Sequence, residues 1–216
     1  DVKWEEVNMH NIGLDVGLLE DRLSVTADYY IKDTKDLLYP VPVPSSVGLA
    51  VHNFNPVNPE LNVGTMRNTG LDLEITYRDN YGKVGLTLNT NASFMKNEVL
   101  QLFGDEYITA GAGGGQIGGM TRTEAGMPVS SFYGFVVQQM LNSETDVYAI
   151  NSWAPDGTYQ EGGTGAGDFM YKDISGPEGV PDGQVTWEHD RTFIGNPWPK
   201  VMYGFNINMS YHQTFD

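Results

Sequence analysis

Apolar and polar side chains alternate with a period of two from Asn68 to Phe94, in the stretch NTGLDLEITYRDNYGKVGLTLNTNASF. The apolar set begins at Leu71, and the alternation resumes after a reversal at Asp79–Gly82. A period of two places the two sets on opposite faces of pleated strands. The stretch therefore predicts a β-hairpin with one apolar face and one strongly polar face. The fold depends on what each of these faces meets.

The same alternation recurs in runs that begin near Ile12, Leu23 and Val201. The sequence contains no long stripe of apolar residues at helical spacing with capping residues at its ends, so no long helix is predicted. We therefore predict an all-β chain with five long strands. Their expected ranges are near 4–19, 22–39, 64–79, 83–100 and 199–213.

Composition excludes several classes of protein. The 216 residues include 12 Lys and Arg against 28 Asp and Glu, a net charge of −16, which argues against nucleic acid as a partner. The chain has no cysteine, so disulfides, thiol catalysis and Cys-based zinc sites are excluded. No run approaches the ~18 apolar residues of a membrane helix. That excludes a helical membrane protein and leaves a membrane barrel open, because barrel strands are only half apolar.

The predicted connections alternate in length. Short turns follow the first and third strands, whereas long loops at 40–63 and 103–198 follow the second and fourth. A loop of about a hundred residues is abnormal in a compact domain but normal on the outer side of a membrane barrel. Ser130 to Leu141 would be a strand within the loop or at the rim. A soluble β-sandwich, with the apolar face as its dry core, is the alternative.

In a barrel the polar face would line a wet lumen and the apolar face would meet lipid. The residues expected to face the lumen are Asp15, Asp28, Asp72, Glu74, Asn89, Asn91, Asn206 and Asn208. The residues expected to face lipid are Leu14, Val16, Val25, Leu71, Leu73, Ile75, Val84, Leu86, Leu88, Phe205 and Ile207.

Six stretches in this order resemble the C-terminal third of SusC/RagA-type TonB-dependent outer-membrane transporters of Bacteroidetes. They are KWEEVNMHNIGLDVGLLEDRLSVTADYYIKDTKDLL (3–38), GTMRNTGLDLEITYRDN (64–80), NASFMKNEVLQL (91–102), GMPVSSFYGFVVQQML (126–141), GDFMYKDISG (167–176) and DRTFIGNPWPKVMYGFNINMSYHQTFD (190–216). The resemblance implies a plugged outer-membrane β-barrel of about 22 strands, of which this chain would supply about five and one very long extracellular loop. The plug domain would be absent from it, so the chain would be part of a longer polypeptide.

The resemblance also implies a function. The barrel would import a glycan oligosaccharide, or a peptide, under a SusD-like lid lipoprotein. TonB would act through the plug rather than through this segment. The remaining partners would be the rest of the barrel and the outer-membrane lipid, with no enzyme activity and no required cofactor. The alternative is a secreted, soluble, carbohydrate-binding sandwich, with or without calcium, and a β-rich glycosidase is a third hypothesis.

Two groups of residues in the long loop are candidate sites. Asp168, Asp173, Asp182 and Asp190 lie in the glycine-rich segment 167–191, where flexible acidic loops can bind Ca²⁺. In the resembling family this segment often carries a calcium-loop-like run, which Ser175 and Pro177 interrupt here, so turn-forming acidic residues are the favoured interpretation. Trp153, Tyr159 and Trp187 are candidate contacts for substrate or lid, although packing within the loop is the favoured interpretation for Trp153 and Trp187.

Overall fold

The computed structural model describes residues 2–40, 51–52, 55–56, 60–102, 104, 107–112, 118–160 and 162–211. The chain divides into two compact units. Unit 1 comprises Asp1–Ile108, Thr123–Val129 and Trp198–Asp216, and unit 2 comprises Thr109–Arg122 and Ser130–Pro197. Within the described part, no helix is both long enough and apolar enough to span a membrane.

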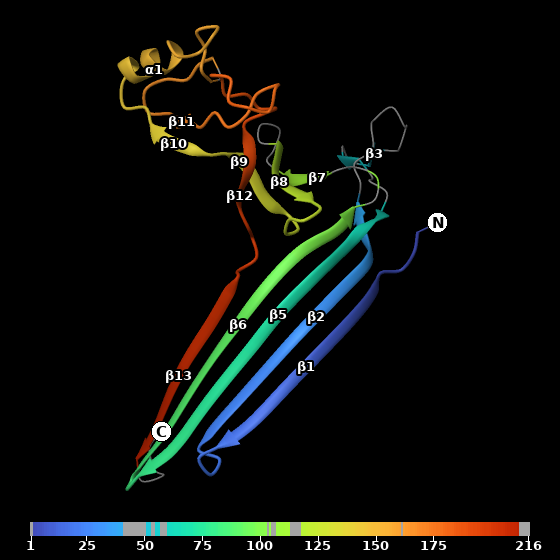
Figure 1. Ribbon diagram of the computed structural model, residues 1–216, viewed down its shortest axis with the longest axis vertical. Coiled ribbons are helices and arrows are strands. Elements are labelled where there is room, and N and C mark those ends of the chain that lie inside the picture. Colours follow the sequence, from blue (N-terminus) through green and yellow to red (C-terminus); the bar gives the residue numbers. More distant parts are fainter. Residues whose placement is uncertain are drawn as a thin grey trace. The chain divides into compact units, whose positions relative to one another are not determined.

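Unit 1 is built around one antiparallel sheet of five strands, which lie side by side in Figure 1. Their order in the sheet is β1-β2-β5-β6-β13. The strands are β1 (Glu6–Leu18), β2 (Leu23–Pro40), β5 (Glu60–Tyr81), β6 (Val84–Leu102) and β13 (Val201–Tyr211). All five overlap ranges expected from the alternation, and β5 begins four residues before its expected start.

Two tight turns join the strands at one end of the sheet. The β1–β2 turn places Leu19, Glu20 and Asp21 at φ values of 56°, 57° and 63°, and the β5–β6 turn has Gly82 at 67°. Three successive non-glycine residues in the left-handed region are strained, and the pairing of the long strands on both sides holds them there. The β2–β5 connection at the other end includes the short strands β3 (Val51–His52) and β4 (Asn55–Pro56). The rest of the loop expected at 40–63 lies outside the described residues, except Pro40 in β2 and residues 60–63 in β5.

The register aligns the two kinds of side chain across all five strands. One row pairs Leu14, Ala27, Leu73, Ala92 and Tyr203 in sequence across the sheet. Paired residues share a face and successive residues alternate, so every second row from the Leu71 row to the Tyr77 row is mostly apolar. The sheet therefore has one apolar face and one polar face in its half nearer the tight turns.

Glycines on the polar face let neighbouring side chains lie flat on the sheet. At Gly70, an added Cβ would lie 2.4–2.6 Å from ring atoms of Tyr30 on the adjacent strand. At Gly204, it would lie 2.8 Å from Oδ1 of Asn91. At Gly70 a larger residue would force the rigid Tyr30 ring to move, whereas at Gly204 the end of the flexible Asn91 side chain could move aside.

Unit 2 has a fold of its own within the range expected as a loop at 103–198, and two of its strands lie in the stretch Ser130 to Leu141 that was expected to form a strand. It contains two small sheets, ordered β12-β9-β8-β7 and β10-β11, and one helix. The elements are β7 (Tyr107–Ala112), β8 (Gly118–Glu124), β9 (Ser131–Phe135), β10 (Val137–Met140), α1 (Glu144–Asn151), β11 (Phe169–Tyr171) and β12 (Arg191–Gly195), with the first two beginning or ending in unit 1. Its buried core is formed by Leu141, Val147, Ile150, Ala154, Tyr159, Met170 and Val185.

The helix α1 was missed because it is short and begins with an unusual cap. The Ser143 side chain accepts a hydrogen bond from Asp146 N, and the Asp146 carboxylate accepts one from Ser143 N. This reciprocal arrangement is a capping box with Asp in place of the usual Glu or Gln. Only Val147 and Ile150 of the helix are buried, so the sequence shows no long apolar stripe.

Candidate functional site

The apolar face of unit 1 is exposed to an extent that is unusual for a folded sheet. Tyr203 is 85% exposed and Phe205 is 65% exposed, and Ile12 and Leu14 are also exposed. Contiguous apolar patches of this kind mark a surface that meets another protein or a lipid phase. We call the rows from the Leu71 row to the Tyr81 row the apolar band. The register places on this face all eleven residues that were expected to face lipid.

Charged rows limit the apolar band on the side away from the tight turns. The next rows on the same face contain Lys96 and then an ion pair in which Arg67 Nε and Nη2 donate to the two oxygens of Asp33 at 2.6 and 2.7 Å. Tyr29 and Phe94 lie in the last apolar row below these charges. Aromatic residues at the edge of an apolar band are typical of membrane–water interfaces.

Aromatic and charged residues also meet near the tight turns. The Tyr77 hydroxyl donates to Asp79 Oδ2 at 2.8 Å, and Arg22 lies 3.5 Å from the same oxygen. Tyr81 and Tyr211 lie in the last rows of the same face. The apolar band thus has an aromatic edge at both ends.

The polar face carries a hydrogen-bonded ladder of carboxylates and amides. Thr26 Oγ1 donates to Asp15 at 2.7 Å, and Asn89 Nδ2 donates to Glu74 at 2.8 Å. Asp28 pairs directly with Asp72, so two like charges face each other across β2 and β5. Adjacent like charges are tolerated where water reaches them. The register places on this face all eight residues that were expected to line the lumen.

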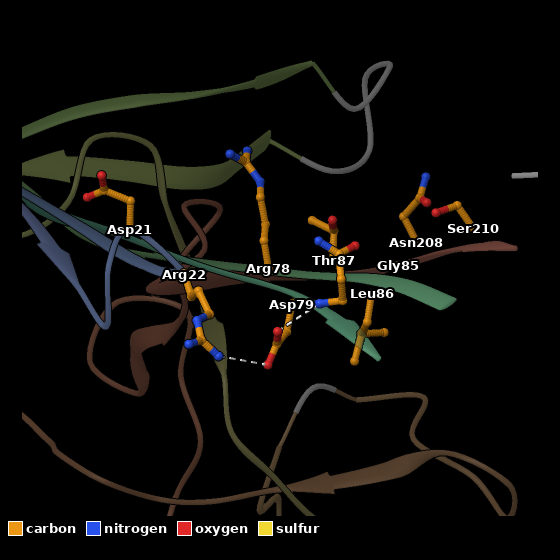
Figure 2. A pocket seen from close by; sticks show the side chains of 10 residues that line it. Asp21, Arg22, Arg78, Asp79, Gly85, Leu86, Thr87, Asn208 and Ser210 are labelled. Atoms are coloured by element: carbon orange, nitrogen blue, oxygen red, sulfur yellow. Dashed lines mark hydrogen bonds and ion pairs between the residues drawn. The ribbon is translucent and has the colours of Figure 1, made fainter. Parts of the chain in front are cut away.

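A hollow at the turn end of the sheet is not a ligand pocket of either face. Figure 2 shows Arg78 and Asn208 pointing to one side of the strands, and Asp79 and Leu86 pointing to the other. A sheet separates the residues on its two faces, so residues on opposite faces cannot contact the same ligand when each face packs against other material. We therefore assign no binding role to this hollow.

The four acidic residues proposed as cation ligands are engaged in holding the loop of unit 2. Asp190 is fully buried, and its carboxylate accepts hydrogen bonds from the backbone N–H groups of Ile174, Ser175 and Thr186 at 2.7–3.2 Å. Asp173 Oδ2 accepts from Gly183 N at 2.7 Å. Among the described residues, no group of three or more His, Cys, Asp or Glu side chains could hold a metal ion. Asp168 and Asp182 each accept one local backbone hydrogen bond.

Burial and nearby charge perturb this acidic cluster. Burial raises the pKa of the Asp173 carboxyl, and the negative charges of Asp190 and Asp182 raise it further. Asp173 Oδ1 is buried without a hydrogen-bond partner in the part of the chain that the structure describes. Burial also raises the pKa of the Tyr159 hydroxyl. The cluster therefore carries a local electrostatic cost within unit 2.

The three aromatic candidates have different environments. Tyr159 is only 6% exposed, and its hydroxyl donates to Tyr171 O and accepts from Asp173 N, so the prediction of a surface contact was wrong for this residue. The local sequence gives no sign that Tyr159 is buried, so this core residue was interpreted as a surface aromatic. Trp153 is exposed and packs edge-on against Tyr159. Trp187 is 57% exposed and lies at a groove.

This groove, which sequence reasoning missed, lies within unit 2 and has a volume of about 970 Å³. We call it the aromatic groove. Phe135 connects two of its other rings, with its centroid 5.0 Å from that of Tyr171 and 5.7 Å from that of Trp187. Its four aromatic residues come from three separate segments, with Phe169 and Tyr171 both on β11, so no single sequence motif marks the groove. The side chains that matter for its chemistry are Phe135, Gln160, Asp168, Phe169, Tyr171 and Trp187.

Comparisons with known proteins agree with this fold. Residues 1–209 match the model of the family described as TonB dependent receptor-like, beta-barrel. TonB-dependent receptor P3 of Formosa agariphila is 30% identical over 100% of this chain and 20% of its own length. TonB-dependent receptor SusC of Bacteroides thetaiotaomicron is 33% identical over 65% of this chain and 14% of its own length.

Solved structures show the same fold. The RagAB peptide importer in its closed-closed state aligns with a TM-score of 0.66 and 23% identity, over 98% of this chain and 20% of that chain. The chain spans about a fifth of the length of the first curated relatives that it matches. The match favours a barrel over the soluble sandwich that the sequence alone left open.

The alternating faces, the exposed apolar band and the family match together show that this chain belongs to the TonB-dependent receptor-like β-barrel family and is an outer-membrane β-barrel segment.

Proposed function

We propose that this chain forms part of the transmembrane wall of a protein that imports a nutrient across the outer membrane. The observation that carries the proposal is the apolar band, which is continuous across five strands and lies opposite a polar face. A two-faced sheet of this kind separates lipid from an aqueous lumen. In a soluble protein a second layer would have to cover the band, and within the described part of unit 1 no layer does so.

In this proposal, the face of the sheet on which a side chain lies determines what that side chain contacts. The eleven apolar residues, Leu73, Ile75 and Phe205 among them, contact lipid. The carboxylates and amides of the ladder, such as Asp72 and Glu74, line the lumen and face the plug inside it. No catalytic residue is assigned, because the family transports rather than catalyses. The role requires no resident cofactor in this chain.

Unit 2 is proposed to act outside the membrane, where substrate and a SusD-like lid lipoprotein meet the barrel. It is inserted between the ends of β6 and β13 that lie opposite the two tight turns. Long loops of outer-membrane barrels lie on the extracellular side, and tight turns lie on the periplasmic side. The imported nutrient is an oligosaccharide or a peptide, and the energy comes from TonB acting through the plug.

Excision of unit 2 residues 130–197 tests this division of labour. The two ends of the excised segment are close, because Trp198 Nε1 donates to Val129 O at 3.2 Å. In addition, Val99 exchanges backbone hydrogen bonds with Gly126 and Met127, which fixes the incoming segment on β6. A short Gly/Ser linker can therefore join residues 129 and 198 without disturbing the wall.

The full-length protein with this excision should reach the outer membrane as a folded barrel, seen as a heat-modifiable band in gel electrophoresis. It should lose nutrient uptake and co-purification of its lid lipoprotein. A control that replaces residues 113–115 by the same linker should keep both. Normal uptake without residues 130–197 would contradict the proposed role of unit 2, and failure of the intact protein to enter the outer membrane would contradict the wall.

A further inference from the structure

The aromatic groove of unit 2 has a chemical character that suggests one class of ligand. We propose that it binds the positively charged side chain of an extended peptide, a lysine or an arginine. This inference rests on the proposed import function and specifies which nutrient unit 2 recognises. Its support comes from the rings, the polar groups and the charge of the groove.

The rings form a nearly continuous surface. Phe135 and Tyr171 lie at its base and pack against the core of unit 2, which fixes their positions. Phe169 and Trp187 are more than half exposed and remain available to a ligand. Ring faces attract cations that lie within about 6 Å of the centroid. The Arg191 guanidinium already lies 4.1 Å from the Trp187 centroid, which shows that this ring can hold a cation.

The polar side chains of the groove leave an acceptor available but no free amide. Gln160 is buried, and its amide nitrogen donates to Thr164 Oγ1 and Phe169 O while its oxygen accepts from Tyr171 N. Asp168 is exposed, and its Oδ2 accepts from Gly165 N at 2.9 Å. Its Oδ1 has no hydrogen-bond partner among the described residues. The available carboxylate oxygen of the groove is therefore an anionic acceptor.

The charge of unit 2 also favours a cation. Its sequence contains ten Asp and Glu against three Lys and Arg, a net charge of −7. Among the described residues that line the groove, Asp168 is the one carboxylate and there is no Lys, Arg or His. The field of such a surface concentrates cations and repels anions. The Arg191 charge opposes this on the Trp187 side, which leaves the side near Phe169 and Asp168 as the favoured position for a ligand cation.

An oligosaccharide fits this groove less well. Sugar hydroxyls both donate and accept hydrogen bonds, so a glycan site needs donors as well as acceptors among its side chains. The groove offers rings for stacking, but the donors of Gln160 are already satisfied within the protein. The Trp187 indole N–H and the Tyr171 hydroxyl are the donors that line the groove without a hydrogen bond to a described residue, and neither carries a charge. An ammonium or guanidinium group can use the anionic Asp168 carboxylate and the ring faces together, which a neutral sugar cannot do.

Binding of a labelled tri-lysine peptide to the full-length protein in detergent, measured by fluorescence anisotropy, tests the proposal. Asp168→Asn keeps an oxygen for Gly165 N but removes the charge, and Trp187→Ala removes a ring. Asp168→Asn should weaken tri-lysine binding about tenfold, and Trp187→Ala should weaken it by less, because Arg191 already stacks on that ring. Trp153→Ala is the matched control, because Trp153 is also an exposed tryptophan of unit 2 but does not line the groove.

Unchanged affinity in both groove variants, or no binding of tri-lysine to the unmodified protein, would overturn the proposal. Binding of maltotriose that is lost in Trp187→Ala would overturn the peptide assignment in favour of a glycan. All variants are also tested for outer-membrane assembly and nutrient uptake. An unmodified protein that assembles and imports but does not bind tri-lysine refutes the groove alone, whereas failure to assemble or import refutes the proposed function.

Discussion

An arginine on the apolar band should destabilise the barrel by an amount that depends on its depth in the band. Ile75→Arg should cost about 2–4 kcal/mol, the range for arginine near the bilayer midplane, whereas Leu71→Arg should cost about 0–1 kcal/mol, the range near an interface. Leu73→Arg should fall between these values. A charge within hydrocarbon loses its hydration, and a charge at the interface keeps it.

The depths follow from the register. The band extends from Leu71 to Tyr81 on β5, which is roughly 33 Å along the strand at about 3.3 Å per residue. A strand tilt of about 45° reduces this to roughly 23 Å, close to the ~25 Å apolar band of outer-membrane barrels. Ile75 lies near the middle of the band, in the row that also contains Val16, Val25 and Phe205.

The assay is urea unfolding of the full-length protein refolded into lipid vesicles, monitored by tryptophan fluorescence and heat-modifiable gel mobility. Glu74→Arg is the matched control, because Glu74 is adjacent to Leu73 and Ile75 but lies on the polar face. Its free energy of unfolding should stay within about 1 kcal/mol of the unmodified protein, since Asp15 and Asp72 on the same face can accept the new charge. Equal costs at Ile75, Leu71 and Glu74 would refute the facing of the strands.

Three further predictions concern packing and charge. Asp190→Ala should destabilise unit 2 by about 3–5 kcal/mol, because it leaves several buried N–H groups unpaired. Faster hydrogen exchange of residues 174–186 in the full-length protein would show this, and unchanged exchange would contradict it. Gly70→Ala should cost about 1–3 kcal/mol through collision with the Tyr30 ring, and Tyr30→Ala in the same chain should recover part of that loss in a double-mutant cycle. Asp173 has a pKa that is higher in the folded state, so its ionisation opposes folding, and stability falls as pH rises from about 3.8 through the raised value. Asp173→Asn should therefore slow hydrogen exchange of unit 2 at pH 7 and have no effect at pH 3, and faster exchange at pH 7 would argue against the raised pKa.

The wall was predictable from sequence because its signal is local. A strand such as β5 shows its two faces in successive residues, and the register then follows from the tight turns and the match of faces. The same local signal showed which residues would share a face. The local signal did not show how deep each residue lies in the apolar band. The position of Phe205 at the middle of the band, for example, depends on the pairing of β13 with β6.

Apart from the strand expected at Ser130 to Leu141, which contains β9 and β10, the fold of unit 2 was not predictable, because its signal is not local. Its core combines residues from Leu141 to Val185 that are separated by loops and follow no period. The burial of Asp190 depends on backbone N–H groups at Ile174 and Ser175, which are distant in sequence. In a glycine-rich acidic segment the sequence suggests a solvated turn or a cation loop, and only the three-dimensional pairing shows a carboxylate that holds the loop together.

The most direct test of the wall uses spin labels along β5. The chain has no cysteine, so single cysteines can be introduced at Asp72, Leu73, Glu74 and Ile75, with any cysteine elsewhere in the full-length protein replaced. Collision of each label with oxygen, which concentrates in lipid, is compared with collision with a water-soluble nickel complex. We predict strict alternation, with oxygen favoured at Leu73 and Ile75 and nickel favoured at Asp72 and Glu74. Uniform accessibility, or the reverse alternation, would contradict the assignment of this chain to a membrane wall.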